Sequence, residues 1–294
     1  MPVAPEETIA ALACWQGLPN IEPLGGGLSN RSFKVTDASG VYVARLGQDF
    51  PFHHVSRRRE VAASRAAHAI GLAPRVAHAG PGVLVLDFID GRTLTAGDLR
   101  GRAGELGATL KHMHPALASG IRGEVSAFWV FHVIRDYLDA LRRHSADLDR
   151  ESLLSRTDAL ERAQRPLPIV FGHHDLLPAN WIDDGKRLWL IDWEYAGFGS
   201  PMFDLANLAD NSGFDPGEEQ ELLASYFGRP PEDDLCRAFA AMKVASALRE
   251  ALWARVSQIH LDAPGADYAA YARACFTKFE TTHAAYAASH EPAE

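Results

Sequence analysis

Cysteine is scarce in this chain: only Cys14, Cys236 and Cys275 occur among 294 residues, and no two lie close together. This spacing argues against a disulfide framework and against a cysteine metal site, and it fits a reducing compartment. Long apolar runs are also lacking, since no stretch approaches the ~20 residues that span a bilayer. The N-terminal segment carries acids instead of the basic region of a secretory signal. We expect a cytoplasmic protein with no membrane partner.

Positive charge is in short supply as well. Lys and Arg number 29 against 38 Asp and Glu, which gives a formal net charge of −9. This balance argues against a nucleic-acid partner and is compatible with a cationic small substrate. The remaining composition is that of an ordinary globular protein, with 47% apolar and 23% charged residues. The length allows one large domain or two lobes with a sizeable core.

The order of the predicted elements divides the chain into two parts. Apolar alternation and turn residues predict a helix over 6–16 and a strand ending at Leu24, followed by strands 32–36, 41–46, 74–78 and 83–88 and a helix over 56–70. After a crossing segment at 89–94, helices are predicted over 98–114, 128–147, 150–164, 217–227, 232–260 and 266–288, interrupted by a hairpin region at 168–192. We therefore predict an α+β fold with a small antiparallel β lobe (1–88) and a larger, mainly helical lobe (89–294). A cleft between lobes is a favoured place for a ligand.

Carboxylate and amide side chains gather around the predicted hairpin. Asp175 follows an apolar β-type run, and Asn180 comes five residues later in the pattern H-x-D-x-x-x-x-N. The turn at 183–186 reverses the chain, and the return strand 187–191 brings Asp192 back toward Asp175. Three polar groups are therefore expected at one end of the hairpin.

This arrangement suits phosphoryl transfer, in which catalysis consists mostly of positioning and charge neutralisation. Asp175 can accept the proton of an attacking hydroxyl group. Asn180 and Asp192 offer the hard oxygen ligands that hold Mg²⁺ against nucleotide phosphates. The spacing from Asp175 to Asn180 equals that of the protein-kinase catalytic loop.

A zinc site at His173-His174-Asp175 is the competing interpretation. No further His or Cys lies nearby at metal-ligand spacing, so zinc is disfavoured. Asp183 and Asp184 are interpreted as turn residues.

Taken in order, the motifs resemble those of the aminoglycoside phosphotransferase and choline kinase superfamily. The resemblance rests on H-x-D-x-x-x-x-N, on L-I-D-W-E-Y-A-G (190–197), on F-D-L-A-N (203–207), on G-G-L-S-N (26–30) and on V-A-R-L-G (43–47). It implies a protein-kinase-like two-lobe fold, ATP and Mg²⁺ as cofactors, and a small alcohol as phosphate acceptor.

The resemblance also implies a nucleotide site in the β lobe. Glycines 25–27 would let backbone N–H groups approach phosphates. Arg45 stands where protein kinases have a lysine, with Glu60 as its ion-pair partner. The implied nucleotide-binding residues are Gly26, Gly27, Ser29, Asn30, Arg45, Glu60 and, in the hinge at 86–89, Asp87 and Ile89.

Around the catalytic loop, the resemblance implies that His173 orients the loop and that Asp204 braces it. The basic run 57–59 is interpreted as a solvated helix face.

The acceptor site is implied by aromatic and acidic residues near the C-terminus. Choline kinases surround a quaternary ammonium group with aromatic faces, through cation–π contacts of ~1–2 kcal/mol when desolvated. The matching positions are Glu194, Tyr195, Asp210, Glu250, Trp253, Tyr268 and Tyr271. Glu250 replaces the first tryptophan of the W-x-x-W motif, and Asp210 is an approximate counterpart of a family acid. Packing in a helical core is an open alternative for Trp253, Tyr268 and Tyr271.

The sequence therefore predicts a kinase that phosphorylates a small cationic alcohol, choline or ethanolamine first. A thiamine kinase, an aminoglycoside or sugar kinase and an inactive kinase-like binding protein are the alternatives. A homodimer is left open.

Overall fold

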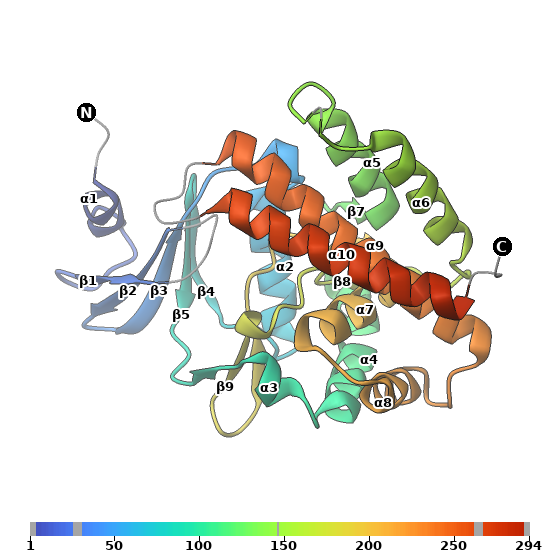
Figure 1. Cartoon of the computed structure of the whole chain (residues 1–294). Coiled ribbons are helices and arrows are strands. Elements are labelled where there is room, and N and C mark those ends of the chain that lie inside the picture. The colour runs from blue at the N-terminus through green and yellow to red at the C-terminus, as the bar shows by residue number, and fades with distance from the viewer. Residues whose placement is uncertain (1–3, 26–30, 146, 262–266, 291–294) are drawn as a thin grey trace.

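The computed structural model describes residues 4–25, 31–145, 147–261 and 267–290, and Figure 1 shows a sheet-containing lobe beside a larger helical lobe. The smaller lobe holds a five-stranded sheet in the order β1-β2-β3-β5-β4, and all of its paired neighbours are antiparallel. The strands are β1 (Asn20–Leu24), β2 (Arg31–Asp37), β3 (Gly40–Leu46), β4 (Val76–Gly80) and β5 (Val83–Asp87). These are the predicted strands, with bounds shifted by at most two residues.

Alternating apolar residues build the core of this lobe. Phe33 and Val35 of β2 pack with Ala44 of β3 and Val85 of β5, as expected for a half-buried sheet. Ile9 of the short helix α1 (Pro5–Ala10) closes the cluster. The predicted helix over 6–16 is too long, because the Trp15 indole folds back and donates to the Ile9 carbonyl, 2.7 Å away.

One helix of the β lobe carries residues of the site. After the 3₁₀ turn η1 (Pro51–His53), helix α2 spans Arg57–Ala69 and buries Glu60 together with Ala63, Ser64 and Ala67. A buried glutamate on an otherwise small-residue face indicates that Glu60 has a charged partner.

The helical lobe contains the main core of the protein. Its helices are α3 (Ala96–Leu99), α4 (Ala103–Gly120), α5 (Val130–Leu141), α6 (Arg150–Arg162), α7 (Pro201–Ser212), α8 (Pro216–Phe227), α9 (Asp233–His260) and α10 (Tyr268–His290). Figure 1 shows α9 and α10 lying side by side. No helix in the described part of the chain is long and apolar enough to cross a membrane.

Several helices of the larger lobe differ from the prediction, and α5 ends at Leu141 instead of at residue 147. The helix predicted over 98–114 begins only at Ala103, because Gly101 takes a left-handed φ of +75° after α3. Helix α7 was missed altogether. It is buried on nearly all sides, so its sequence lacks the one-sided apolar pattern of a surface helix. Pro201 at its start and the Ser200 side chain, which caps the Met202 N–H, begin it.

Two small sheets lie in the helical lobe and correct the predicted hairpin region. Only β9 (Trp181–Asp183) and β10 (Leu188–Leu190) form the hairpin, with β6 (Arg92–Thr93) on its other edge. Strand β8 (Val170–Gly172) instead pairs with β11 (Gly197–Gly199), which also pairs with β7 (Ala127–Phe128). A Cβ at Gly199 would lie 2.5 Å from the Phe128 carbonyl oxygen, so glycine permits this close approach.

Candidate active site

Helix α7 holds the loop that follows β8. The buried Asp204 carboxylate accepts hydrogen bonds from the backbone N–H groups of His173 (2.8 Å) and His174 (2.7 Å). Asn207, one turn further along α7, accepts from the Leu176 N–H at 2.7 Å. Residues three apart share a helix face, so α7 presents two acceptors to one loop. Asn207 was not among the predicted residues, although it ends the F-D-L-A-N motif.

A histidine from another helix completes the surroundings of Asp204. The His114 ring Nε2 lies 3.0 Å from the Asp204 carboxylate. Burial alone would raise the pKa of Asp204, but the His114 hydrogen bond and the neighbouring histidines hold that pKa below its usual range. Asp204 is therefore a buried anion at the base of the loop.

The His173 ring is held by backbone groups on both sides. Its Nδ1 accepts from the Asp175 N–H (3.2 Å), so the ring proton resides on Nε2, which donates to the Ile191 carbonyl at 3.0 Å. Burial lowers the pKa of His173, which favours the neutral ring. With both nitrogens engaged by backbone groups, the ring ties the loop of Asp175 to the end of β10.

The structure brings Asp175, Asn180 and Asp192 together, as the sequence predicted. The Asn180 side-chain amide donates to the Asp175 carbonyl at 2.8 Å. The Ile191 N–H donates to the Asn180 carbonyl at 3.0 Å, which places Asp192 beside them. Asp192 has a left-handed φ of +67°, a conformation that is uncommon outside glycine and that concentrates at functional sites.

Asp175 has the electrostatic character of a proton acceptor. Burial raises the pKa of its carboxyl group well above the usual range; the Arg249 charge opposes this rise, and the Glu250 and Asp192 charges add to it. A carboxylate whose pKa is shifted toward neutrality is better matched to general base catalysis than an ordinary aspartate.

An ion-pair network joins the β lobe to Asp192. Arg45 on β3 contacts Glu60 of α2 at 2.9 Å and Asp192 at 2.8 Å. Arg57 contacts Glu60 at 2.7 Å and Glu194 at 2.8 Å. The Arg45–Glu60 pair inferred from the sequence is thus present, and it is buried rather than exposed.

The interpretation of the run 57–59 as a solvated face is wrong for Arg57. Its side chain is only 15% exposed, whereas that of Arg58 is 83% exposed. The reason is position: Arg57 begins α2 and lies three residues before Glu60, so both side chains lie on the inner face of the helix.

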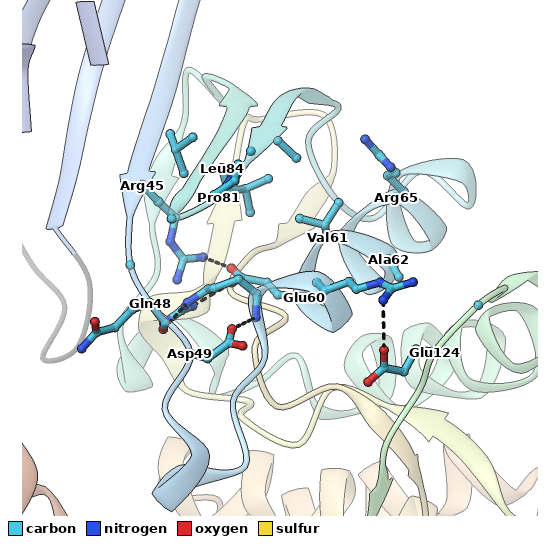
Figure 2. A pocket seen from close by; sticks show the side chains of 18 of the residues that line it. Arg45, Gln48, Asp49, Glu60, Val61, Ala62, Arg65, Pro81, Leu84 and Glu124 are labelled. Atoms are coloured by element: carbon cyan, nitrogen blue, oxygen red, sulfur yellow. Dashed lines mark hydrogen bonds and ion pairs between the residues drawn. The ribbon is translucent and has the colours of Figure 1, made fainter. Parts of the chain in front are cut away.

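A cavity of about 870 Å³ lies beside the Arg45–Glu60 pair, which Figure 2 joins by a dashed line. It is bounded by the end of β3, by α2 and by the turn between β4 and β5. The arginines that line it are Arg45, Arg57, Arg58, Arg65 and Arg122. Asp175, Asn180 and Asp192 are not among its described lining residues, so this cavity meets the polar cluster only through Arg45.

The remaining predicted nucleotide residues are less tightly connected to the cluster. Gly26, Gly27, Ser29 and Asn30 lie outside the described residues. Asp87 ends β5, and its carboxylate is bonded to Arg75 at 3.0 and 2.8 Å. Ile89 lies partly buried in the segment between β5 and β6. The roles of these residues stay predictions.

The predicted aromatic residues do come together. The Trp253 indole N–H donates to the Tyr195 hydroxyl at 2.8 Å, and the rings of Tyr268 and Tyr271 each lie 6.3 Å from the Trp253 ring. The Tyr271 hydroxyl donates to Glu250 at 2.8 Å. Tyr195, Trp253 and Tyr268 are buried, so the alternative of core packing holds for much of their surface.

Arg249 is a neighbour that sequence reasoning missed. Its guanidinium carbon lies 4.6 Å from the centre of the Tyr195 ring. An arginine in an alanine-rich helix is expected at the surface, yet this side chain is 2% exposed. One face of the Tyr195 ring is therefore covered by a cation of the protein itself.

Two predicted substrate residues have other partners. Asp210 pairs with Lys278 of α10 at 2.8 Å, so its carboxylate is directed to that helix. Glu194 is bonded to Arg57 and belongs to the arginine network.

The polar cluster has the donor chemistry that Mg²⁺ requires. This ion prefers oxygen ligands and is bound by one or two carboxylates together with substrate phosphates. Asp192, with 29% of its side chain exposed, and the side-chain oxygen of Asn180 are donors of that kind. Within the described ranges no group of three or more His, Cys, Asp or Glu residues could hold a metal ion. Magnesium bound here would therefore need phosphate oxygens as further ligands.

Comparison with known proteins identifies the family of this chain. A model of the phosphotransferase enzyme family matches residues 20–243. A probable ethanolamine kinase of Arabidopsis thaliana is 25% identical over 273 residues, which cover 80% of this chain and 72% of that protein.

Two solved structures share the fold. A choline/ethanolamine kinase family protein from Mesorhizobium loti has a TM-score of 0.75 and 28% identity, with 94% of this chain and 92% of that chain covered. The choline kinase LicA from Streptococcus pneumoniae has a TM-score of 0.75 at 23% identity, with 91% and 94% covered. These similarities confirm the predicted kinase-like two-lobe fold. The chain belongs to the phosphotransferase enzyme family, as the order of its motifs had indicated.

Proposed function

We propose that this protein is an ATP-dependent kinase that phosphorylates the hydroxyl group of a small amino alcohol. The observation that carries the proposal is the half-buried carboxylate of Asp175, held beside Asn180 and Asp192. The relatives named as ethanolamine and choline/ethanolamine kinases support this acceptor class.

In the proposed reaction the acceptor oxygen attacks the γ-phosphorus of ATP, and the bond between that phosphorus and the bridging oxygen of ADP breaks. Asp175 takes the proton of the acceptor hydroxyl group. Asn180 and His173 hold the Asp175 backbone, which keeps the carboxylate in line with the hydroxyl. Proton removal by a positioned carboxylate contributes about 10²- to 10⁴-fold to such a rate.

The proposed nucleotide site uses charge from both lobes. Arg45 would contact the phosphates, with Glu60 fixing its orientation. Asn180 and Asp192 would hold Mg²⁺, which when bound offsets the negative charge of the phosphates. Because Asp192 also contacts Arg45, it would align the metal with the phosphate-binding arginine.

At the acceptor end, Glu250 supplies negative charge for an amine. It is 25% exposed and is held by Tyr271 on one oxygen and by Arg249 on the other. A carboxylate fixed in this way is suited to an ammonium group.

The test is ADP formation with purified protein across a panel of alcohols. We expect turnover with at least one small amino alcohol among choline, ethanolamine, 3-aminopropanol, L-serine and L-homoserine. Preferred turnover of thiamine, kanamycin or glucose would assign the acceptor to the alternative kinases. ADP formation with none of these compounds would favour an inactive binding protein.

Substitution of the proposed metal ligand gives a second expected result. Asp192→Asn keeps a residue that tolerates the left-handed backbone but removes the charge. Mutation of an outer-shell partner of a metal site typically costs 10- to 100-fold in metal affinity, so for a direct ligand we expect the Mg²⁺ concentration for half-maximal rate to rise by at least about 10-fold. Asp183→Asn is the matched control, because Asp183 bonds the turn residue Gly185 and Arg102. An unchanged Mg²⁺ dependence in Asp192→Asn would contradict the assignment.

A further inference from the structure

Arg249 on α9 has hydrogen-bonding capacity that no described residue of the chain uses. Its Nη1 donates to Glu250 at 2.9 Å, and its guanidinium covers the Tyr195 ring. Its Nε and Nη2 atoms are buried and donate no hydrogen bond to any residue that the structure describes. Leaving such donors unpaired in a buried place costs about 1–3 kcal/mol each. An acceptor bound next to Arg249 would recover this free energy.

The two unused donors lie on one edge of the guanidinium group. That edge presents two parallel N–H bonds, which match the two oxygens of a carboxylate. The same edge binds carboxylates elsewhere in this chain. Arg75 contacts Asp87 through Nε (3.0 Å) and Nη2 (2.8 Å), and Arg102 contacts Glu105 through Nε (2.8 Å) and Nη2 (3.0 Å).

Arg249 lines a cavity of about 90 Å³, together with Tyr195, Tyr137, His53 and Phe128. The volume exceeds the ~30 Å³ share of one water molecule, so a group of a few atoms fits. Both ring nitrogens of His53 are engaged, by the Tyr137 hydroxyl at 3.0 Å and by the Ser257 hydroxyl at 2.9 Å. Burial lowers the pKa of His53 to about 2, so this wall is neutral and Arg249 supplies permanent positive charge.

The cavity shares a wall residue with the predicted acceptor site. Tyr195 lines the cavity and is also one of the predicted acceptor-site residues, and Trp253 of that site donates to its hydroxyl at 2.8 Å. A quaternary ammonium group would have to share the Tyr195 ring with a guanidinium of the same charge. A carboxylate in this cavity would instead be attracted to Arg249.

We propose that the acceptor is an amino alcohol that also carries a carboxylate, which the Nε and Nη2 atoms of Arg249 bind in bidentate fashion. The inference rests on the proposed kinase function and specifies its substrate class as a hydroxy amino acid. The amine faces Glu250, and the carboxylate is unchanged in the reaction. The hydroxyl oxygen gains the γ-phosphoryl group, ADP leaves, and the hydroxyl proton passes to Asp175.

Matched substrate pairs test the proposal. L-Serine is ethanolamine with an added carboxylate, and L-homoserine is 3-aminopropanol with an added carboxylate. Hydrogen bonds to charged groups are worth about 1.5–3 kcal/mol, so we expect kcat/KM to favour the acid by about 10- to 150-fold in at least one pair.

Variants of Arg249 then test whether the preference for the carboxylate-bearing substrate depends on this residue. Arg249→Met should reduce the ratio of kcat/KM within the pair to near one, and Arg249→Lys, which keeps the charge but not the paired donors, should give an intermediate ratio. Arg255→Met is the matched control from the same helix, because Arg255 contacts Ser145 and Asp147 instead. It should leave the ratio unchanged. If Arg249→Met does not fold, Arg249→Lys alone still decides the outcome.

The outcomes separate this inference from the proposed function. Faster turnover of ethanolamine or choline than of every acid, or a ratio that is insensitive to Arg249, overturns the carboxylate site and leaves the kinase function standing. Calorimetric binding of L-serine or L-homoserine that is lost in Arg249→Met, without turnover of any alcohol, retains the site and overturns the kinase function. If neither binding nor turnover is detected, both the carboxylate site and the kinase function are overturned.

Discussion

Asp175→Asn is expected to lower kcat by about 10²- to 10⁴-fold, the usual contribution of a general base. The variant keeps the shape of the side chain but cannot accept the proton of the acceptor hydroxyl group. ATP binding should be largely retained, because the phosphate contacts proposed for Arg45 and the metal contacts proposed for Asp192 do not involve the Asp175 carboxylate. Steady-state rates and calorimetric titration with ATP measure the two effects separately.

The pH dependence of the wild-type rate is a second test of Asp175 as the base. Asp175 must be ionised to act as a base, and its pKa in the folded protein is raised. The value of kcat/KM should therefore fall as the pH decreases through a pKa above the usual ~3.9 of aspartate. Asp183→Asn is the control, because Asp183 accepts a hydrogen bond within the turn. This variant should retain both the wild-type kcat and the wild-type pH profile. A rate for Asp175→Asn within about tenfold of wild type would contradict the assignment, because it falls short of the ~10² expected for a base.

Asp204→Asn is expected to lower the free energy of unfolding by about 3–5 kcal/mol, the usual cost of disrupting a buried charged network. The carboxylate receives the His173 and His174 N–H groups and the His114 ring, and an amide can replace only part of this accepting capacity. Denaturant unfolding at pH 7 measures the loss. Asp158→Asn is the control, because its ion pair with Arg135 is half exposed and such pairs contribute only about 0–1 kcal/mol.

The pH dependence of this loss follows from the sign of the shift. The pKa of Asp204 in the folded protein is lowered, while in the unfolded chain it lies near ~3.9. The stabilisation by Asp204 is therefore complete at pH values above the pKa of this residue in the unfolded chain. It is lost as the pH falls through the lower pKa of the folded protein. The difference between wild type and Asp204→Asn should be full at pH 7 and should narrow below about pH 4. If the two proteins differed in free energy of unfolding by the same amount at pH 7 and below about pH 4, the charge of Asp204 would not be the cause of the stabilisation.

Features encoded in short segments could be predicted from the sequence. The strands of the small lobe follow from alternation, and the grouping of Asp175, Asn180 and Asp192 follows from one loop and one hairpin. The Arg45–Glu60 pair joins different elements, and the family resemblance implied it.

Features that depend on distant segments could not be predicted. Helix α7 is enclosed on most sides, so no amphipathic pattern marked it. The pairing of β8 with β11 depends on close approach at glycines, and the His114 contact to Asp204 comes from a helix 90 residues away. The burial of Arg249 is set by the packing of α9 against Tyr195, which composition does not reveal.

Phosphorus NMR spectroscopy of a reaction of the protein with ATP, Mg²⁺ and the preferred amino alcohol tests the central claim most directly. The account predicts ADP and a phosphate monoester of the alcohol in equal amounts with wild-type protein, and almost no ester with Asp175→Asn. Formation of ADP and inorganic phosphate alone, or of the ester at the wild-type rate by Asp175→Asn, would contradict it.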